Sequence, residues 1–362
     1  MAVTPVGGFG TADALTVKHW SASLYQQALM DMYFGKYIGK SADSLIENKF
    51  DLTKQKGDQV TFGLLMKMSG AGRVGDASME GNEESLAYFN YAQKIYLRKN
   101  AVLAAGKFSM RMTETDFRRD AKMGLSGWLK EIMEQDIIYA LSGLANTAAT
   151  VAVNAPSTNR VWKGGQTSAG VVEHVTTDAL IDSATNNLFG AAVISVIKRK
   201  AQLASPKIRP IKVDGKEYYI IFVHPNQAKA LKADTDWKNA QLHAAERGSK
   251  NPIFSGMLGV IDGVVVQEHD GIITKTGDGE DGTYFESGDP INTTLTVARA
   301  LFCGAQAGII GWGQQPSWSE KMFDYGDVPG IKTDVIYGVG KPEFDSEDFG
   351  VIAVDTLSVP DA

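Results

Sequence analysis

The residues that could do chemistry in this chain are scattered rather than clustered. Its five histidines include no pair at the spacing of metal ligands, and neither a zinc-protease motif nor a nucleophile elbow occurs. The single cysteine, Cys303, lies in an apolar stretch typical of a strand, which indicates a buried and inert thiol. One cysteine also excludes an intrachain disulfide and a cysteine-rich metal site. We therefore expect no catalytic, cofactor or metal site, although catalytic groups can converge in space without a sequence motif.

Two glycine-rich stretches look like phosphate-binding loops. Residues 35–41 (GKYIGKS) place their glycines one residue too close for a P-loop, and they follow a helical pattern instead of a strand. Residues 277–282 (GDGEDG) have the glycine spacing of a dinucleotide-binding turn. However, a strand-like run follows them, and their carboxylates would repel a pyrophosphate. We interpret the first stretch as a helix end with a turn, and the second as a solvated loop in preference to a weak cation site.

The composition indicates a folded, acidic protein made in a reducing compartment. The 362 residues are 44% hydrophobic and 22% charged, with a formal net charge of −6. This length predicts one large or two medium domains with an ample core. The negative charge argues against a protein whose main task is to grip nucleic acid. The N-terminal segment carries no Lys or Arg through Leu15, so we expect no secretory signal, and no apolar run is long enough for a membrane helix.

A long amphipathic helix at residues 113–143 is the element around which the rest must be arranged. Apolar residues recur on one helical stripe, and no proline interrupts it. Thr113 or Thr115 can cap its start, and Gly143 marks its end. At 1.5 Å per residue, the helix would be a rod of roughly 40–45 Å.

Two strands before this helix predict a long ribbon. Residues 58–68 alternate between apolar and polar side chains, and a second strand runs from Phe89 to Leu97. About twenty residues rich in glycine and acidic side chains separate them, far more than a hairpin turn needs. A lone two-stranded ribbon is marginal in water, so this one must lie on its own domain or across a neighbouring subunit. The glycine-rich residues 1–17, an arm without a core of its own, raise the same question.

The chain after the long helix predicts an α+β protein with a second, strand–helix–strand domain. A second amphipathic helix is predicted from Asp178 to a point before Pro206. A buried strand at 218–223 turns at His224 into a short helix, and strand residues follow at 260–268. From residue 291 onward the chain reads as strands and turns, with strands predicted at 295–302, 334–339 and 349–355.

Several short runs, taken in order along nearly the whole chain, resemble one known family. They are residues 11–15 (TADAL), 57–62 (GDQVTF), 75–84 (GDASMEGNEE), 140–143 (ALSG), 254–263 (FSGMLGVIDG), 305–307 (AQA), 324–326 (DYG) and 349–350 (FG). As a set they resemble the major capsid protein family of tailed bacteriophages, in the group typified by the phage N-four coat protein. The resemblance implies the Hong-Kong-97-type capsid fold, which is an α+β fold.

The resemblance also implies a domain plan and a role. An N-terminal arm would occupy residues 1–52, and an extended loop (E-loop) residues 53–100. A peripheral domain would comprise 101–175 and 285–362, with residues 113–143 as its spine helix, and an axial domain would comprise 176–284. The implied role is structural and not enzymatic: self-assembly into hexamers and pentamers of an icosahedral head that encloses double-stranded DNA.

Within this resemblance, the ribbon is the expected assembly element. We expect its apolar residues to support subunit contact through packing, and its charged tip to contact a neighbouring subunit. The candidate residues are Val60, Phe62, Leu64, Phe89 and Tyr91 on the ribbon and Arg73, Glu80, Glu83 and Glu84 at its tip. The implied partners are further copies of the chain, a portal protein, scaffolding or decoration proteins, and packaged DNA held non-specifically at the inner surface. No membrane and no cofactor is implied, and the protein would reside in the virion capsid after assembly in the host cytoplasm.

Two other interpretations stay open on the residues alone. One is a soluble α+β enzyme or carbohydrate-binding module with a large β-insertion. The other is an encapsulin-like compartment shell with the same fold. The size of the purified protein separates the first from a capsid protein, because a binding module forms a monomer or a small oligomer. The cargo, DNA or an enzyme, separates the second.

Overall fold

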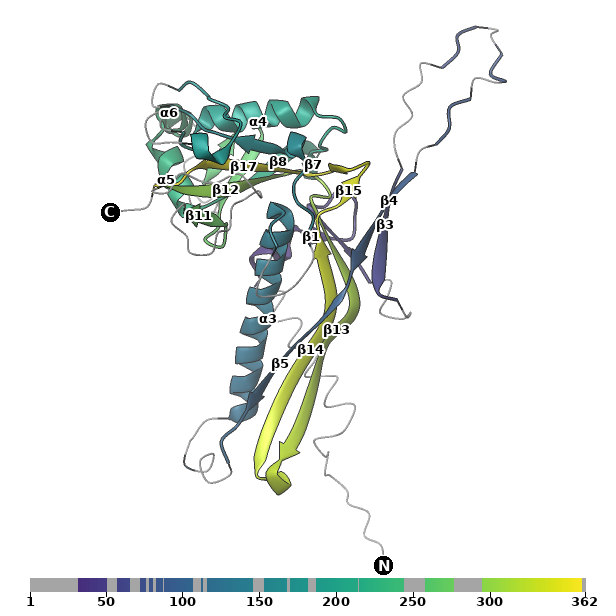
Figure 1. Cartoon of the computed structure of the whole chain (residues 1–362), viewed down its shortest axis with the longest axis vertical. Helices are drawn as coiled ribbons and strands as arrows, with labels where there is room; N and C mark the ends of the chain where they lie inside the picture. Colours follow the sequence, from purple (N-terminus) through teal and green to yellow (C-terminus); the bar gives the residue numbers. More distant parts are fainter. Residues whose placement is uncertain are drawn as a thin grey trace, which may run out of the picture.

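The computed structural model shows a long helix beside a long sheet, with a wider second sheet across one end of both (Figure 1). The described residues are 32–50, 57–65, 72–75, 78–80, 83–86, 88–106, 112, 116–145, 153–167, 170–181, 187–213, 215–243, 258–276 and 295–359. Among them, no helix is both long and apolar enough to cross a membrane.

The long helix is α3 (Phe117–Ser142). It begins after Asp116, whose carboxylate accepts a hydrogen bond from the Arg118 backbone N–H, and it ends at Gly143, whose φ of 71° is left-handed. The predicted helix and its glycine stop are therefore confirmed. The predicted threonine cap is wrong, because Asp116 fills that role; residues 113–115 lie outside the described residues. The predicted apolar stripe is confirmed by the burial of Leu125.

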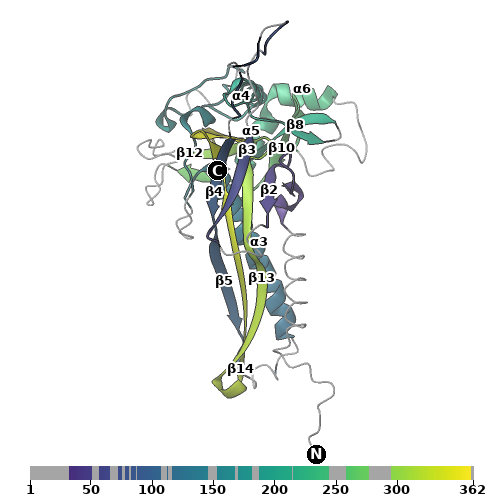
Figure 2. The same ribbon diagram turned by 90° about the vertical axis from the view of Figure 1, so that its right-hand side faces the viewer.

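A five-stranded sheet runs along α3, in the order β1-β2-β13-β14-β5. The antiparallel pair β13 and β14 is its main part, and β5 pairs with the outer edge of β14. The strands are β1 (Ile38–Gly39), β2 (Ile46–Lys49), β5 (Tyr96–Leu103), β13 (Gly308–Phe323) and β14 (Val328–Gly340). Figures 1 and 2 both show β5, β13 and β14 lying along the helix. The apolar stripe of α3 packs in one cluster with Trp312, Trp318, Val335 and Tyr337 of the sheet, so the helix and the sheet share a core.

An eight-stranded sheet crosses the C-terminal end of α3, with the main order β6-β17-β12-β8-β10-β9. Two short strands extend it, because β11 pairs with β12 and β7 pairs with β8. Its strands are β6 (Val161–Lys163), β7 (Ile211–Val213), β8 (Lys216–Val223), β9 (Gly259–Ile261), β10 (Val264–Glu268), β11 (Thr274–Thr276), β12 (Thr296–Cys303) and β17 (Val351–Leu357).

The eight-stranded sheet is buried on both faces. Alternate residues of β8 divide between two clusters: Phe222 joins the core shared with α3, whereas Ile221 joins a second core with the helices. Those helices are α4 (Ala191–Leu203), α5 (Pro225–Ala233) and α6 (Thr235–His243). Burial on both faces explains the continuous apolar run by which the sequence predicts this strand, and that prediction is confirmed.

One sequence prediction about the second domain needs correction. The helix predicted from Asp178 is a short 3-10 turn, η4 (Asp178–Leu180), and α4 starts only after Gly190. The C-terminal strands divide between the two sheets. β13 and β14 belong to the five-stranded sheet, but β12 and β17 lie at the centre of the eight-stranded sheet, because they pair with each other and with β8. Hydrophobic patterning predicts strands but contains no information on which sheet they join.

Residues 32–50, which fall within the expected N-terminal arm, belong to the core. Phe34, in the turn η1 (Tyr33–Tyr37), is fully buried against Phe222 and His269, with ring centroids 5.2 Å and 5.4 Å away. β2 pairs with β13 in parallel. This part of the expected arm therefore packs on its own subunit. The P-loop-like residues 35–41 form the end of η1, β1 and a turn, as interpreted from the sequence.

A buried ion pair joins two neighbouring strands of the eight-stranded sheet to the end of α3. Arg299 of β12 donates to both carboxylate oxygens of Asp355 on β17, over 2.7 Å and 2.6 Å, and to the backbone oxygen of Ser142 over 3.1 Å. Both charged side chains have no exposed surface. A buried charge without its counter-charge strongly destabilises a fold. This pair therefore favours the arrangement in which β12, β17 and the end of α3 meet.

We predict that Asp355→Asn destabilises the fold by about 3–5 kcal/mol, because it leaves the Arg299 charge buried without its counter-charge. The measurement is the free energy of unfolding in urea. Glu217→Gln is the control: it breaks the exposed pair of Lys212 and Glu217, 3.9 Å apart, and should change stability by less than about 1 kcal/mol. Equal effects of the two substitutions would contradict the assignment.

We also predict that stability falls as the pH drops below about 6.5, the ordinary histidine pKa, partly through His269. Burial lowers the pKa of His269, against the opposing pull of the Asp270 and Glu134 carboxylates. Below pH 6.5 the unfolded chain therefore takes up a proton that the folded imidazole resists, which favours unfolding. His269→Gln should have a smaller loss of urea midpoint between pH 7.5 and 5.5 than the unchanged chain. Parallel pH profiles would exclude this role.

Candidate functional site

The predicted ribbon exists and is formed by β3 (Gln59–Leu65) and β4 (Tyr88–Lys94). The two strands are antiparallel, and Phe62 lies opposite Tyr91 and Leu64 opposite Phe89. The second predicted strand, residues 89–97, is not continuous. It breaks at Ile95, after which β5 leaves the ribbon and pairs with β14 instead. Figure 1 shows the ribbon leaving the side of the molecule where β13 and β14 meet the second sheet.

The base of the ribbon lies on glycines of the long sheet, which we call the glycine bed (Gly311, Gly313, Gly338 and Gly340). A Cβ atom at Gly311 would lie 2.8 Å from Val60, and one at Gly313 would lie 2.7 Å from Ile95. At Gly338 and Gly340 an added Cβ would collide with the backbone of Lys94 and with the side chain of Gln93. The ribbon can therefore approach the sheet closely only because these positions have no side chain.

Burial on the inner face of the ribbon decreases from base to tip. Val60 and Phe62 are buried in a small cluster with Ile309, which Tyr91 and Ile95 join. Leu64 and Phe89, one pair further out, are only half-buried. The base is also held by a cation, because the Lys49 ammonium lies 4.5 Å from the centre of the Phe62 ring and donates to the Thr61 backbone oxygen. The body of the subunit therefore buries the base of the ribbon and leaves the residues nearer its tip more exposed.

The described part of the ribbon tip is exposed and carries both charges and apolar side chains. The predicted contact residues Arg73, Glu80, Glu83 and Glu84 are all exposed. Between and beside them, large apolar side chains also face solvent, which the sequence prediction did not name. They are Val74, Met79, Leu86 and Tyr88, with exposed fractions of 90%, 52%, 50% and 69%.

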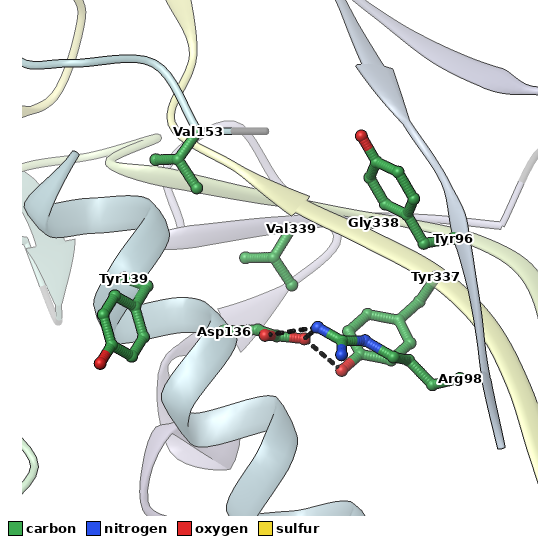
Figure 3. Close-up of a pocket in the computed structure, with 8 residues that line it drawn as sticks. All are labelled: Tyr96, Arg98, Asp136, Tyr139, Val153, Tyr337, Gly338 and Val339. Carbon is green, nitrogen blue, oxygen red and sulfur yellow. Dashed lines mark hydrogen bonds and ion pairs between the residues drawn. The ribbon is translucent and has the colours of Figure 1, made fainter. Parts of the chain in front are cut away.

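A buried polar cluster fixes β5, and with it the ribbon, against α3 (Figure 3). The Arg98 guanidinium donates to both carboxylate oxygens of Asp136, over 2.9 Å and 3.1 Å, and the Tyr337 hydroxyl donates to the same carboxylate over 2.6 Å. Burial raises the pKa of Asp136 even though both donors oppose the shift. The carboxylate of Asp136 on α3 thus joins the helix to two adjacent strands, through Arg98 of β5 and Tyr337 of β14.

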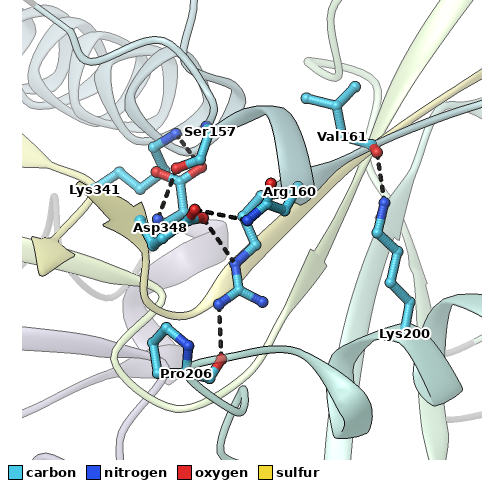
Figure 4. A network of polar contacts seen from close by, with 9 residues as sticks. Ser157, Arg160, Val161, Lys200, Pro206, Lys341 and Asp348 are labelled. Carbon is cyan, nitrogen blue, oxygen red and sulfur yellow. Dashed lines mark hydrogen bonds and ion pairs between the residues drawn. The ribbon is translucent and has the colours of Figure 1, made fainter. Parts of the chain in front are cut away.

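A second polar network lies next to a small hairpin that contacts β4 (Figure 4). The fully buried Lys341 ammonium lies 2.8 Å from the Asp348 carboxylate, which also accepts the Ser157 backbone N–H over 3.1 Å. Arg160 donates to the Pro206 backbone oxygen over 2.7 Å, and thereby joins η3 (Thr158–Arg160) to the segment after α4. Lys341 lies two residues before the small hairpin of β15 (Glu343–Phe344) and β16 (Glu347–Asp348). In this hairpin, β15 contacts β4.

Two cavities of the subunit do not resemble a catalytic pocket. The one beside Asp136 has a volume of about 10 Å³, which is room for a single water molecule. A larger cleft of about 220 Å³ at the N-terminus of α4 is lined mainly by small residues, and its carboxylate, Asp234, already accepts the Ala191 N–H. Within the described residues, no three His, Cys, Asp or Glu side chains are grouped as metal ligands.

Two side chains that the sequence analysis considered for catalysis, Cys303 and His224, have structural roles. Cys303 is fully buried, and burial raises the pKa of its thiol well above the ordinary range, so the predicted inert thiol is confirmed. The His224 imidazole accepts the Asn226 N–H and caps α5, as its place in a turn before Pro225 predicts. The glycine-rich residues 277–282 lie outside the described residues.

The structure brings some predicted assembly residues together and separates others. Val60, Phe62 and Tyr91 meet at the base, where they pack on their own chain, whereas the charged residues lie apart at the tip. The sequence analysis missed the glycine bed. Its signal was present as two Gly-x-Gly runs, residues 311–313 and 338–340, because a glycine within a strand marks a close backbone approach.

Comparison with known proteins identifies what kind of molecule has this architecture. The sequence pattern of the family described as "Phage capsid protein" matches residues 8–360, almost the whole chain. This chain belongs to the phage capsid protein family. It is 29% identical over 362 residues to the major capsid protein of Pseudomonas phage KPP25. The match covers 92% of this chain and 93% of that protein. The predicted structural role, as the major capsid protein that forms the virion shell, is therefore confirmed.

Solved capsid structures share the fold of this family member. The capsid of Ralstonia phage GP4 is similar with a TM-score of 0.77 and 26% identity, over 91% of this chain and 92% of that chain. The cyanophage Pam1 capsid asymmetric unit is similar with a TM-score of 0.71 and 27% identity, over the same shares. The predicted Hong-Kong-97-type capsid fold is confirmed. The family assignment sets aside the enzyme and the carbohydrate-binding module as interpretations.

For this capsid protein, we predict that Phe62→Ala loosens the ribbon base at a cost of about 3–5 kcal/mol, because it empties a fully buried aromatic site. Hydrogen exchange of the β3 and β4 amides measures the effect where it arises, even if the rest of the fold stays intact. Leu64→Ala is the matched control on the same strand face, and it should have a clearly smaller effect because Leu64 is half-buried. Equal protection in both variants would show that the base does not anchor the ribbon.

Proposed function

We propose that this capsid protein assembles into hexamers and pentamers of an icosahedral phage head around double-stranded DNA, and that the ribbon is the element reaching the neighbouring copy. The observation that carries the proposal is the uneven covering of the ribbon. Its base is fixed on the glycine bed, whereas the side chains described beyond Leu64 and Phe89 (72–75, 78–80, 83–86 and 88) are exposed. A fixed base with an exposed apolar tip is typical of an arm whose apolar surface is buried against another molecule.

The domain roles follow the same proposal. The ribbon and its tip would be the E-loop, α3 the spine helix, and the long sheet with α3 the peripheral domain. The eight-stranded sheet with α4, α5 and α6 would be the axial domain. Within it we place β12 and β17, although they come from the C-terminal part of the chain, because they lie at the centre of its sheet.

The contact proposed for the ribbon tip has an apolar and an ionic part. Val74, Met79, Leu86 and Tyr88 would bury apolar surface on the neighbour, which supplies most of the affinity in such contacts. Glu80, Glu83 and Glu84 would face positive charge there and set the register of the contact. Val60, Phe62 and Tyr91 would act indirectly, by fixing the direction in which the ribbon leaves the body.

The other partners belong to the same proposal. A portal protein would occupy one vertex, scaffolding or decoration proteins would assist assembly, and assembly would take place in the host cytoplasm. Packaged DNA would be held without sequence specificity at the inner surface. The net charge of −6 supports a container that does not bind tightly to its contents, because phosphate groups repel an acidic chain.

We predict that removing residues 70–84 abolishes shells of normal size while leaving the folded body intact. The described residues of this segment are exposed, so the unfolding temperature should change little. Electron microscopy and sedimentation of the expressed protein measure assembly, and the cargo found inside separates a DNA-filled head from an enzyme-filled compartment.

Two triple variants serve as a matched pair for the ionic part. Glu80→Lys, Glu83→Lys and Glu84→Lys together should reduce assembly more than the corresponding Gln variant, because the first reverses the charge and the second only removes it. Normal shells from the deletion variant would refute the role of the ribbon tip.

A further inference from the structure

His269 lies where three parts of the subunit meet: the end of β10, the long helix α3 and the turn η1. Its side chain is only 8% exposed. The rings of Tyr33 and Phe34 in η1 pack against it, with ring centroids 4.5 Å and 5.4 Å away. Gly271 lies so close that an added Cβ atom would be 3.0 Å from the imidazole and 2.9 Å from Ile138 of α3. The ring is therefore enclosed by η1 and by a turn that packs tightly on α3.

The hydrogen bond of this imidazole fixes its protonation state. Its Nδ1 accepts the backbone N–H of Gly271 over 3.0 Å, so the proton of the neutral ring lies on Nε2. A second proton would add at Nδ1, where it would face the Gly271 N–H and remove the acceptor. The Asp270 carboxylate lies 3.6 Å from Nδ1, but this side chain is exposed and solvent screens its charge. Protonation therefore breaks a hydrogen bond and places a charge in a buried site.

η1 is held at the same junction by contacts of Tyr33. The Tyr33 backbone N–H donates to Glu134 of α3 over 2.5 Å, and the Tyr33 hydroxyl donates to Gln267 of β10 over 3.0 Å. A cleft of about 960 Å³ opens beside these contacts, and Tyr33, Glu134 and His269 all line it. Because the cleft reaches the imidazole, a small movement of η1 would bring the ring into water.

Charged and titratable groups surround His269 on the described elements that pack around it. They are Lys130, Glu131 and Glu134 on α3, Glu268 and Asp270 beside the ring, Tyr33 and Lys36 on η1, His224 directly after β8 and Lys232 on α5. Burial lowers the pKa of His269 and outweighs the opposing carboxylates of Asp270 and Glu134. Burial also raises the pKa of Tyr33 to about 12, so its hydroxyl stays neutral where histidine titrates.

We propose that His269 is a proton-operated latch: the neutral ring holds η1 against α3 and the end of β10, and protonation releases η1 while the two sheets stay folded. The inference does not depend on shell assembly, because all of these contacts lie within one subunit. An imidazole that resists a proton when enclosed and titrates normally when exposed favours release as the pH falls. η1 is the first described element, so the latch acts where residues 1–31 join the body.

His224 offers a matched comparison at the same edge of the sheet, because β8 and β10 are parallel neighbours. Its Nδ1 accepts the Asn226 N–H over 3.2 Å. Burial lowers the pKa of His224 too, against the carboxylates of Asp270 and Glu268. However, its hydrogen bond caps α5 and does not hold η1. Protonation of His224 should therefore loosen the start of α5 and leave η1 in place.

Hydrogen exchange of the full chain at pH 7.5 and 5.5, corrected for the intrinsic pH dependence of exchange, tests the latch. The opening of the η1 amides should rise by up to about tenfold over this range, the largest factor that one group with an ordinary pKa of about 6.5 supplies. His269→Gln should remove the rise, because its amide oxygen can accept the Gly271 N–H but does not titrate. His224→Gln is the control and should keep the rise.

Three results would overturn the proposal. One is an equal rise in η1 exchange for the unchanged chain and for His269→Gln, and another is loss of the rise in His224→Gln. The third needs no variant to fold, because it compares two elements of the unchanged chain. The amides of α4, which packs in the other core, should rise less than those of η1. An equal rise in η1 and α4 would mean that acid loosens the whole subunit instead of one latch.

Discussion

The close approach of the ribbon to the long sheet is the contact on which the arrangement of this capsid protein depends. Four glycines remove the side chains that would hold β3 and β4 away, and Val60 and Ile95 fill the space that this leaves. Closely packed side chains leave little room for movement. The base of the ribbon is therefore held in one orientation relative to the long sheet. A long arm transmits that direction to its tip, so a small error at the base becomes a large displacement at the contact with a neighbour.

Buried polar groups play a related part in the body. The Arg98, Asp136 and Tyr337 cluster and the Arg299 and Asp355 pair each join three elements at one carboxylate or guanidinium. Such pairs add little net stability compared with apolar packing, since desolvation offsets most of the attraction. However, a misplaced partner leaves a buried charge uncompensated, which is a severe penalty. We infer that these networks select one relative placement of α3 and the two sheets rather than add to the stability of the core.

Among the described residues, half of the large apolar side chains that are exposed lie at two extremities of the subunit. One is the ribbon tip, with Val74 and Tyr88, and the other is the end of the long sheet around η6 (Asp324–Gly326), with Tyr325. The body between them has a continuous core that joins the helix to both sheets. A folded body with bare apolar ends has the properties that a shell subunit needs, because it can fold before it meets its neighbours and still gain burial when it does.

The sequence by itself determined the elements whose signal is local. The apolar stripe of α3, its stop at Gly143, the alternation in β3 and the turn at His224 depend on residues close together in the chain, and each is found. The family resemblance added the fold. Only the tertiary structure decided that β12 and β17 leave β13 and β14 for another sheet, and that Val60 and Phe62 pack on their own glycine bed. These strand pairings join residues tens of positions apart, and the glycine contacts join residues more than 200 positions apart. Hydrophobic periodicity within a short window contains no information about such partners.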